Sequence, residues 1–329
     1  MLRADVESPN SDSDARARDR LRIRCPLTRS DRADALEADS RKSTTMQLVM
    51  FSKHLGPLSV RQAGETVRRL GFAGLDLTVR AGGHVLPENV EADLPTALRE
   101  IRDLGLDIPM ITTGLVDAAE GRAEAIMATA SQLGIRQLKL GYWPYRPFGK
   151  IHEQLDSARR AMDGLEALAR KHNVRACIHS HSGNCLSAEA GNIYLILQDR
   201  DPHHVGAYLD PGHMTLEGGY QGWMQGIDLL QHYISMVAVK TFGHFPEKNE
   251  ATGEVTWKNR LVPLKEGIVR WREVFSCLRQ AGWDGVVTFH SEYQGSHSFR
   301  DLTLDELVVQ TGEDLAYLRP IIRDAGYAV

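Results

Sequence analysis

Several features that define whole classes of proteins are missing from this sequence. Its four cysteines show no CxxC spacing, which argues against a cysteine zinc site and favours free thiols in a reducing compartment. No apolar run approaches the ~18 residues that a membrane span needs. The formal net charge is −4, so no basic surface for nucleic acid is indicated. We therefore expect a cytoplasmic protein that binds neither nucleic acid nor membranes.

Aromatic residues are absent from the first 45 positions of the chain. Residues 1–45 contain no Phe, Trp or Tyr, and charged residues are frequent among them. A segment of this composition buries too little apolar surface to offset the entropy that ordering costs. No apolar core of a secretory signal follows its basic residues. We predict a disordered extension over residues 1–45 and a folded domain over residues 46–329.

From Met46 onward, apolar runs typical of strands alternate with longer stretches of helical periodicity. The predicted strands are Gln47–Phe51, Gly74–Leu77, Ile108–Ile111, Gln137–Leu140, Arg175–Ile178, Val205–Leu209, Met236–Val239 and Gly285–Phe289. The predicted helices include Ser59–Leu70, Glu88–Leu104, Glu120–Leu133, Ile151–His172, Arg270–Ala281 and Leu304–Arg323. This alternation predicts an α/β fold, a (β/α)8 TIM barrel. An open doubly wound sheet is the alternative, which the lack of a GxGxxG motif disfavours.

Residues that can carry chemistry directly follow four of the predicted strands. The motifs are Ile178-His179-Ser180-His181, Leu209-Asp210-Pro211-Gly212-His213, Ala238-Val239-Lys240-Thr241 and His290-Ser291-Glu292-Tyr293. The carboxyl ends of barrel strands meet on one face, where active sites are built. We therefore expect the four motifs to form one constellation.

The first two motifs contain candidate ligands for a divalent metal. His179 and His181 share side-chain parity, and two imidazoles at i and i+2 are good ligands. Asp210 precedes a sharp turn and His213, an arrangement that can hold a cation and aim an imidazole at what the cation binds. The plain structural alternative is that Asp210 caps the next helix.

The last two motifs add an amine and a carboxylate. Glu292 would project into the barrel mouth, although a shift of one residue in the register would turn His290 inward instead. Lys240 follows a buried strand, where an ammonium group can neutralise an enolate or a phosphate. It can also act as a base if its pKa is depressed. The structural alternative for Lys240 is a lysine that only extends toward solvent.

Further residues near strand ends are candidates for substrate contacts. Asp76 alternates with apolar neighbours, and Arg80 and His84 follow it with side chains suited to hydroxyl or anion contacts. Lys139 lies near the end of the fourth strand. Three aromatic residues beyond it are candidates for a wall against a sugar ring: Tyr142, Trp143 and Tyr145. The charged stretch Glu247–Arg260 is typical of a mobile loop that covers a site.

These motifs resemble those of the xylose isomerase-like TIM-barrel superfamily of sugar (phosphate) isomerases and epimerases. The resemblance spans residues 46–323 and depends on Leu209-Asp210-x-x-His213, Val239-Lys240 and Glu292-Tyr293. It implies a divalent metal, which the family holds with a Glu on strand five, an Asp on strand six, a His on strand seven and a Glu on strand eight. It also maps His213 onto a histidine that contacts the substrate.

Two of the implied ligand positions differ in this chain. His179 stands where the Glu of strand five is expected, and Ala238 where the His of strand seven is expected. The implied ligand set is therefore His179, Asp210 and Glu292, which leaves room for water or substrate. Mn, Mg and Zn all suit such a set. The symmetrical proton transfer between two carboxylates, which epimerases of the family use, is not expected to operate unchanged.

We expect a metal-dependent isomerase or epimerase that acts on a sugar, polyol or ketosugar through an enediolate. The predicted catalytic residues are Glu292, His213, Lys240 and His181. Either Glu292 or a histidine would move the proton, while Lys240 and His213 would stabilise the enediolate. The alternatives are a lyase or dehydratase on a ketosugar or ketoglycoside, and a non-catalytic barrel with a decayed metal site. Barrels of this family often dimerise, which makes a homodimer a candidate assembly.

Overall fold

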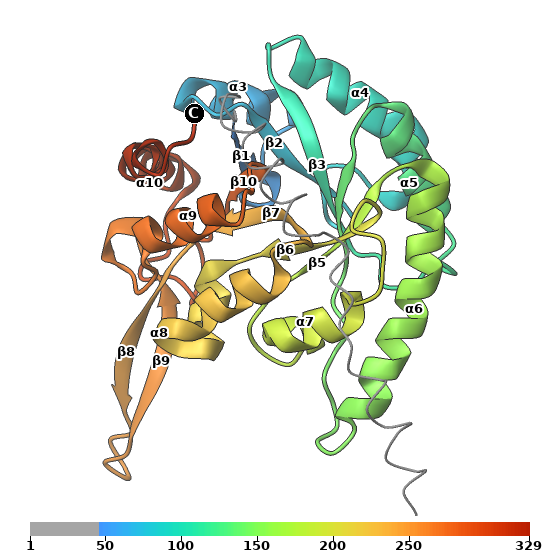
Figure 1. Ribbon diagram of the computed structural model, residues 1–329. Helices are drawn as coiled ribbons and strands as arrows, with labels where there is room; N and C mark the ends of the chain where they lie inside the picture. Colours follow the sequence, from blue (N-terminus) through green and yellow to red (C-terminus); the bar gives the residue numbers. More distant parts are fainter. Residues whose placement is uncertain (1–45) are drawn as a thin grey trace, which may run out of the picture. The chain divides into compact units, whose positions relative to one another are not determined.

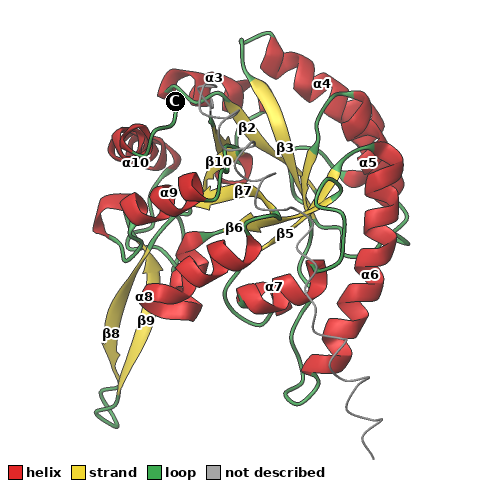
Figure 2. Ribbon diagram, viewed as in Figure 1, coloured by secondary structure: helices red, strands yellow, loops and turns green. Residues whose placement is uncertain are grey.

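The computed structural model describes residues 46–329, which form a closed barrel surrounded by helices (Figures 1 and 2). The strand order around the barrel is β1, β10, β7, β6, β5, β4, β3 and β2. Every neighbouring pair in the barrel is parallel. The predicted TIM barrel is therefore confirmed, whereas the predicted disordered extension lies outside the described residues.

The barrel strands coincide with the predicted ones to within two residues at each end. They are β1 (Gln47–Phe51), β2 (Gly74–Val79), β3 (Asp107–Thr113), β4 (Gln137–Lys139), β5 (Arg175–His179), β6 (Val205–Leu209), β7 (Ile234–Val239) and β10 (Val286–Phe289). Several are buried along their whole length. Because helices cover the barrel on the outside, such strands are apolar on both faces and form recognisable runs in the sequence.

Eight α-helices of the described residues surround the barrel. They are α3 (Val60–Leu70), α4 (Val90–Arg102), α5 (Ala123–Gln132), α6 (Ile151–His172), α7 (Ala190–Leu197), α8 (Pro211–Leu230), α9 (Trp271–Gln280) and α10 (Leu304–Asp324). Four short 3-10 helices are η2 (Ser52–Leu55), η3 (Pro87–Asn89), η4 (Leu186–Ala188) and η5 (Leu264–Glu266). The predicted helices are all present. Helices α7 and α8 were not among the predicted ones; α8 is rich in glycine and is interrupted at Gly219, whose φ is 63°.

The connection between β7 and α9 contains an antiparallel hairpin of β8 (Phe242–Lys248) and β9 (Val255–Leu261). It projects away from the barrel beside α8 (Figure 1). The expectation of a loop over Glu247–Arg260 is therefore wrong. Most side chains of β9 are exposed on both faces, and those of β8 alternate between half-buried and exposed positions. The hairpin sequence therefore lacks the apolar alternation that reveals a strand with one buried face.

A small apolar cluster, separate from the main core, fills the barrel interior. Its members are Val49, Met110, Cys177, Tyr208, Met236, Ala238 and Val286. Side chains packed inside a small barrel leave no open channel, so any binding site must lie at the strand ends. None of the helices within residues 46–329 combines the length and the apolarity needed to cross a membrane.

Candidate functional site

The polar strand ends surround a pocket with a cavity volume of about 120 Å³ at the carboxyl-terminal face of the barrel. Its lining residues are Phe51, Lys53, Arg80, Thr112, Lys139, Tyr142, His179, His181, Tyr208, Lys240, His290 and Glu292. Three of the four sequence motifs contribute to this lining, and the remaining one supplies Asp210 and His213 directly behind it.

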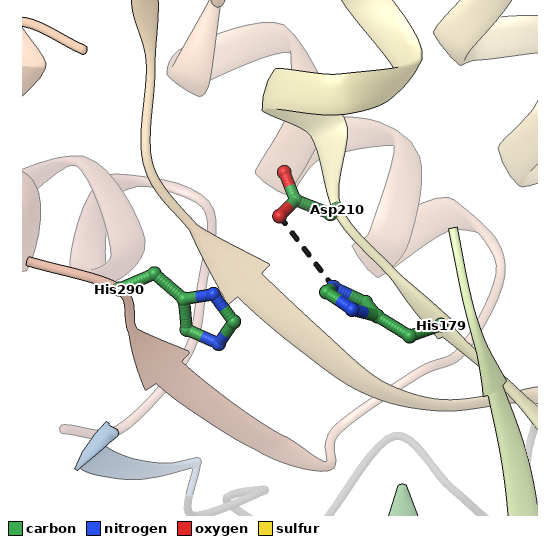
Figure 3. A group of neighbouring side chains, drawn as sticks. All are labelled: His179, Asp210 and His290. Atoms are coloured by element: carbon green, nitrogen blue, oxygen red, sulfur yellow. Dashed lines mark ion pairs between the residues drawn. The ribbon is translucent and has the colours of Figure 1, made fainter. Parts of the chain in front are cut away.

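Three buried residues of these motifs point toward one another: His179, Asp210 and His290 (Figure 3). One ligand atom from each lies within 4.8 Å of the others, and His179 Nε2 is 3.5 Å from Asp210 Oδ2. Among the described residues, His179 Nε2, Asp210 Oδ2 and His290 Nδ1 have no hydrogen-bond partner. Leaving buried polar atoms without partners is costly. A divalent cation bound between them would satisfy all three, so the residues present fit a metal.

Two tyrosine hydroxyls form hydrogen bonds with the imidazole nitrogens of His179 and His290 that face away from Asp210. The Tyr142 hydroxyl is 2.8 Å from His179 Nδ1, and the Tyr208 hydroxyl is 2.8 Å from His290 Nε2. Partners of this kind orient metal-binding histidines and fix the tautomer. Burial lowers the pKa of both His179 and His290. The rings are therefore neutral near pH 7, the form that binds a metal.

The two roles that the sequence suggested for Asp210 involve different oxygens of its carboxylate. Its Oδ1 accepts a hydrogen bond from the backbone N–H of His213 at 3.1 Å and so caps α8. Its Oδ2 is the atom that faces His179 and is left without a hydrogen bond. The cap of α8 is therefore observed at Oδ1, and Oδ2 is the candidate ligand atom.

Lys240 lies between two carboxylates at the end of β7. Its Nζ is 3.3 Å from Asp210 Oδ2 and 3.1 Å from Glu292 Oε1. Burial opposes the charge, yet the two carboxylates raise the pKa of Lys240 above its ordinary value. Burial likewise opposes ionisation of Glu292, yet Lys240 holds the pKa of that carboxyl well below its usual range. Lys240 is therefore an ammonium group, and the alternative of a base with a depressed pKa is not supported.

His181 and His213 form a second pair of imidazoles beside Asp210. Their ring centroids are 3.9 Å apart, and His213 Nε2 is 3.8 Å from Asp210 Oδ2. Ser182 Oγ lies 2.7 Å from His213 Nδ1. Burial lowers the pKa of both rings, so they are neutral donors or acceptors at pH 7.

Helix α10 fixes which residues after β10 face the pocket. Ser291 accepts a hydrogen bond of 2.8 Å from Thr311 on α10, and Tyr293 donates one to Asp314 on the same helix. Because Ser291 and Tyr293 point toward α10, the alternate residues His290 and Glu292 both line the pocket. The sequence analysis left open whether Glu292 or His290 points inward, and in the structure both side chains line the pocket.

The predicted substrate-contact residues divide into two groups. Arg80 and Lys139 line the pocket, whereas Asp76 and His84 do not. Asp76 is fully buried and accepts hydrogen bonds from Thr112 Oγ1 at 2.8 Å and from Thr288. Burial raises the pKa of Asp76 to about 7. The His84 ring lies against Thr78 Oγ1 at 3.3 Å.

Of the three predicted wall aromatics, only Tyr142 lines the pocket. Trp143 and Tyr145 instead pack against the hydrophobic core, so the proposed sugar-stacking wall is reduced to one ring. Sequence reasoning missed His54, whose Nε2 lies 3.9 Å from Glu292 Oε1. His54 follows β1 by three residues, and the strand-end rule applied to β1 would have found it.

Residues 65–321 match the model of the xylose isomerase-like TIM barrel family. The chain belongs to this family. The resemblance inferred from Asp210, His213, Lys240 and Glu292 is thus confirmed at the level of the family. A comparison with curated proteins found no match to this chain.

Solved structures of the same architecture resemble this family member at low sequence identity. The 3-keto-D-glucoside 4-epimerase YcjR from E. coli is 12% identical with a TM-score of 0.62, over 84% of this chain and 100% of its own. The probable 3-DHS dehydratase AsbF from Bacillus anthracis is 18% identical with a TM-score of 0.59, over 82% and 99%. A xylose isomerase-like TIM barrel protein from Mycobacterium smegmatis, in complex with magnesium, is 16% identical with a TM-score of 0.59, over 86% and 99%. At these identities the similarity establishes the fold.

Proposed function

We propose that this protein is a metal-dependent isomerase or epimerase that acts on a sugar, polyol or ketosugar through an enediolate. The observation that supports this most is the convergence of three buried ligand atoms without hydrogen bonds at the mouth of the barrel, where one of them, Asp210 Oδ2, forms an ion pair with Lys240. The solved structures that resemble the chain include a ketoglucoside epimerase. By analogy with that enzyme, we propose a small-molecule substrate.

His179, Asp210 and His290 are the residues that would hold the metal. Glu292, which the sequence analysis also predicted to be a ligand, stays a predicted ligand, because it does not belong to this group of three residues. Two imidazoles and one carboxylate suit Zn or Mn better than Mg. When bound, the metal would polarise adjacent substrate oxygens and so acidify the neighbouring C–H.

The remaining polar residues have complementary roles in the proposed reaction. Glu292 is ionised and lines the pocket, so it is the proposed base that removes the proton from carbon. Lys240 is a permanent positive charge placed to stabilise the developing enediolate. His213 and His181, both neutral, are the proposed groups that return or relay the proton.

A lyase or dehydratase on a ketosugar or ketoglycoside is the second candidate. When an enediolate has a leaving group on its β-carbon, the carbonyl re-forms, a C=C bond forms and the group is expelled. A hydroxyl group leaves as water after it takes a proton, which His213 or His181 could supply, so the same pocket serves both reactions. The dehydratase among the similar structures favours keeping this alternative. We further propose that the enzyme is cytoplasmic, in keeping with its free thiols, and that it assembles as a homodimer.

The test is metal content, measured by elemental mass spectrometry on protein purified without chelator. Near-stoichiometric metal is expected in the wild type and in Arg61→Ala, which removes an exposed helix ion pair. It should be lost in Asp210→Ala and in His290→Ala, with folding checked by circular dichroism. Absence of metal from the wild type, even after reconstitution, would overturn the proposal.

Turnover is then measured by NMR as deuterium uptake from heavy water into the C–H positions of candidate ketoses. Isomerases and epimerases incorporate solvent deuterium beside the carbonyl, whereas a lyase also produces a dehydrated product. Glu292→Gln should retain metal and lose deuterium uptake. If Glu292→Gln exchanges as fast as the wild type, Glu292 is not the base.

A further inference from the structure

We infer that the substrate carries an anionic group, a carboxylate or a phosphate, and that Arg80 and Lys139 bind it. This inference concerns the pocket of the proposed function and names the substrate class. It depends on that function only for the assumption that the pocket binds a substrate.

The charges of the pocket lining are unequal in number. Four cationic side chains line it, whereas Glu292 is the lining carboxylate. Lys240 is matched by Asp210 and Glu292. Within residues 46–329, no ion pair is formed by the other three cations, Lys53, Arg80 and Lys139. The pocket thus has positive charge that the protein itself does not neutralise.

Among these cations, Lys139 is the one whose missing counter-ion is energetically costly, because its ammonium group is buried. Its side chain is only 3% exposed, and its Nζ lies 3.7 Å from the centroid of the Tyr142 ring. A cation–π contact compensates only part of what an ammonium group loses on leaving water. Burial and the neighbouring Arg80 lower the pKa of Lys139 to about 7. A bound anion would restore the full charge and give it a partner.

The nearest acidic residue on this side of the pocket does not fill that role. Asp76 is held by Thr112 and Thr288 beneath the pocket lining, and it forms no ion pair with Lys139 among the described residues. Its own pKa, raised by burial to about 7, leaves it largely protonated below neutral pH. The counter-ion for Lys139 must therefore come from outside the protein.

Arg80 supplies the second contact at the outer edge. Its guanidinium lies over the Phe51 ring with Cζ 5.7 Å from the centroid, and its side chain is half-buried. A guanidinium offers paired donors that match the oxygens of a carboxylate or phosphate. With Arg80 and Lys139 on the anion, the rest of the substrate would extend toward His179, Asp210 and His290. The anion would thus orient the substrate in the pocket.

The experiment compares a neutral ketose with anionic derivatives of the same carbon skeleton. Thermal melting at constant ionic strength is measured with D-fructose, with 2-keto-D-gluconate, which has a carboxylate in place of one hydroxymethyl group, and with D-fructose 6-phosphate. Inorganic phosphate and acetate serve as minimal probes. All are tested on metal-loaded and on chelator-treated protein, so that anion binding to the metal is separated from binding to the side chains.

At least one anionic ligand should bind about tenfold or more tightly than D-fructose, as expected for hydrogen bonds to charged groups. This preference should disappear in Arg80→Met and in Lys139→Met. It should persist in Lys258→Met, which removes an exposed lysine of the hairpin. Preference for the carboxylate or for the phosphate ligand identifies which anion the substrate carries.

Two results would overturn the inference. One is that no anion stabilises the wild type more than D-fructose does. The other is that the preference survives in both variants. Metal in the protein without anion preference would leave the proposed function standing and remove the inference. Anion preference in a protein without metal would support the inference and overturn the proposed metal-dependent function.

Discussion

Two lysines at the ends of barrel strands, Lys240 and Lys139, show how differently one residue type can behave on one face of a fold. Both are almost fully buried. Lys240 has carboxylate oxygens at 3.3 and 3.1 Å, whereas Lys139 has the face of Tyr142. The pKa of Lys240 is raised and that of Lys139 is lowered to about 7. Position in the fold places a lysine in the site, and its neighbours decide its charge.

The largest expected effect separates the two lysines by stability. Lys240→Met would leave Asp210 and Glu292 buried without their cation, which costs about 3–5 kcal/mol when one partner of a buried pair is removed. Lys139→Met removes a buried cation that has no counter-ion, so its stability should change by less than about 1 kcal/mol. Urea unfolding of the chelator-treated proteins measures both. Equal losses in the two variants would show that the contrast between them is wrong.

Two substitutions of Asp210, which pairs with Lys240, separate its role as the cap of α8 from its proposed role as a metal ligand. Asp210→Asn keeps a side-chain oxygen for the cap of α8, since Asn caps as well as Asp does. It removes the charge at Oδ2, so metal affinity should fall by at least about 10–100-fold, comparable to the loss of a supporting ligand interaction. Asp210→Ala should lose metal too and in addition about 1 kcal/mol of stability from the missing cap. If Asp210→Asn retains wild-type metal content, Oδ2 is not a ligand.

Asp76, the acid on the Lys139 side, predicts a pH dependence of stability. Its pKa is about 7 in the folded protein against an ordinary value of 3.8. The folded state therefore keeps a proton that the unfolded state has lost, and stability falls as the pH rises from about 4 to about 7. The groups around this carboxyl are Thr112, Thr288, Lys139 and Arg80.

Asp76→Asn should remove this decline. Relative to the wild type, the variant should gain on the order of 2 kcal/mol in going from pH 5 to pH 8. Melting curves of both proteins at the two pH values provide the measurement, because the other titrating groups are common to both. An unchanged difference between the variant and the wild type at the two pH values would contradict the raised pKa.

The smallest effect concerns how firmly Glu292 is held against Lys240. Tyr293→Phe removes the hydrogen bond to Asp314 and should cost about 1 kcal/mol of stability, with a lower kcat because Glu292 is less well fixed. Tyr327→Phe is the matched control, since its hydroxyl donates a buried hydrogen bond of 2.7 Å to Trp283 O, which is not among the residues that line the pocket. Stability should fall similarly in both variants, but kcat only in Tyr293→Phe. A similar drop of kcat in both would indicate a general loss of stability.

Most of the barrel could be predicted from the sequence, and the exceptions have physical causes. Strands buried on both faces form apolar runs, and the helix stop at Gly71, where φ is 87°, follows from the conformational freedom of glycine. Helix α8 was missed because glycine interrupts it, and the hairpin was missed because solvent surrounds most of β9. In the hairpin, the burial pattern that makes periodicity visible is absent.

The candidate site was predictable in its membership and not in its electrostatics. Topology brings strand ends together, so His179, Asp210, Lys240 and Glu292 could be grouped from their positions alone. That His290 joins the triple and that Glu292 is engaged by Lys240 depends on distances of a few ångströms, which a motif does not encode. The same holds for Asp76, which alternates correctly along β2 and yet lies beneath the pocket lining.

Strand β1 pairs with β10, and α10 forms hydrogen bonds with residues that follow β10. These contacts have a consequence for protein synthesis. Gln47 pairs with Val286, and Ser291 and Tyr293 are held by Thr311 and Asp314. In a growing chain, the edge of β1 that faces β10 therefore has no partner until Val286 has been synthesised, although its other edge can pair with β2. Until β10 and α10 have emerged from the ribosome, the barrel cannot close and the pocket lacks His290 and Glu292.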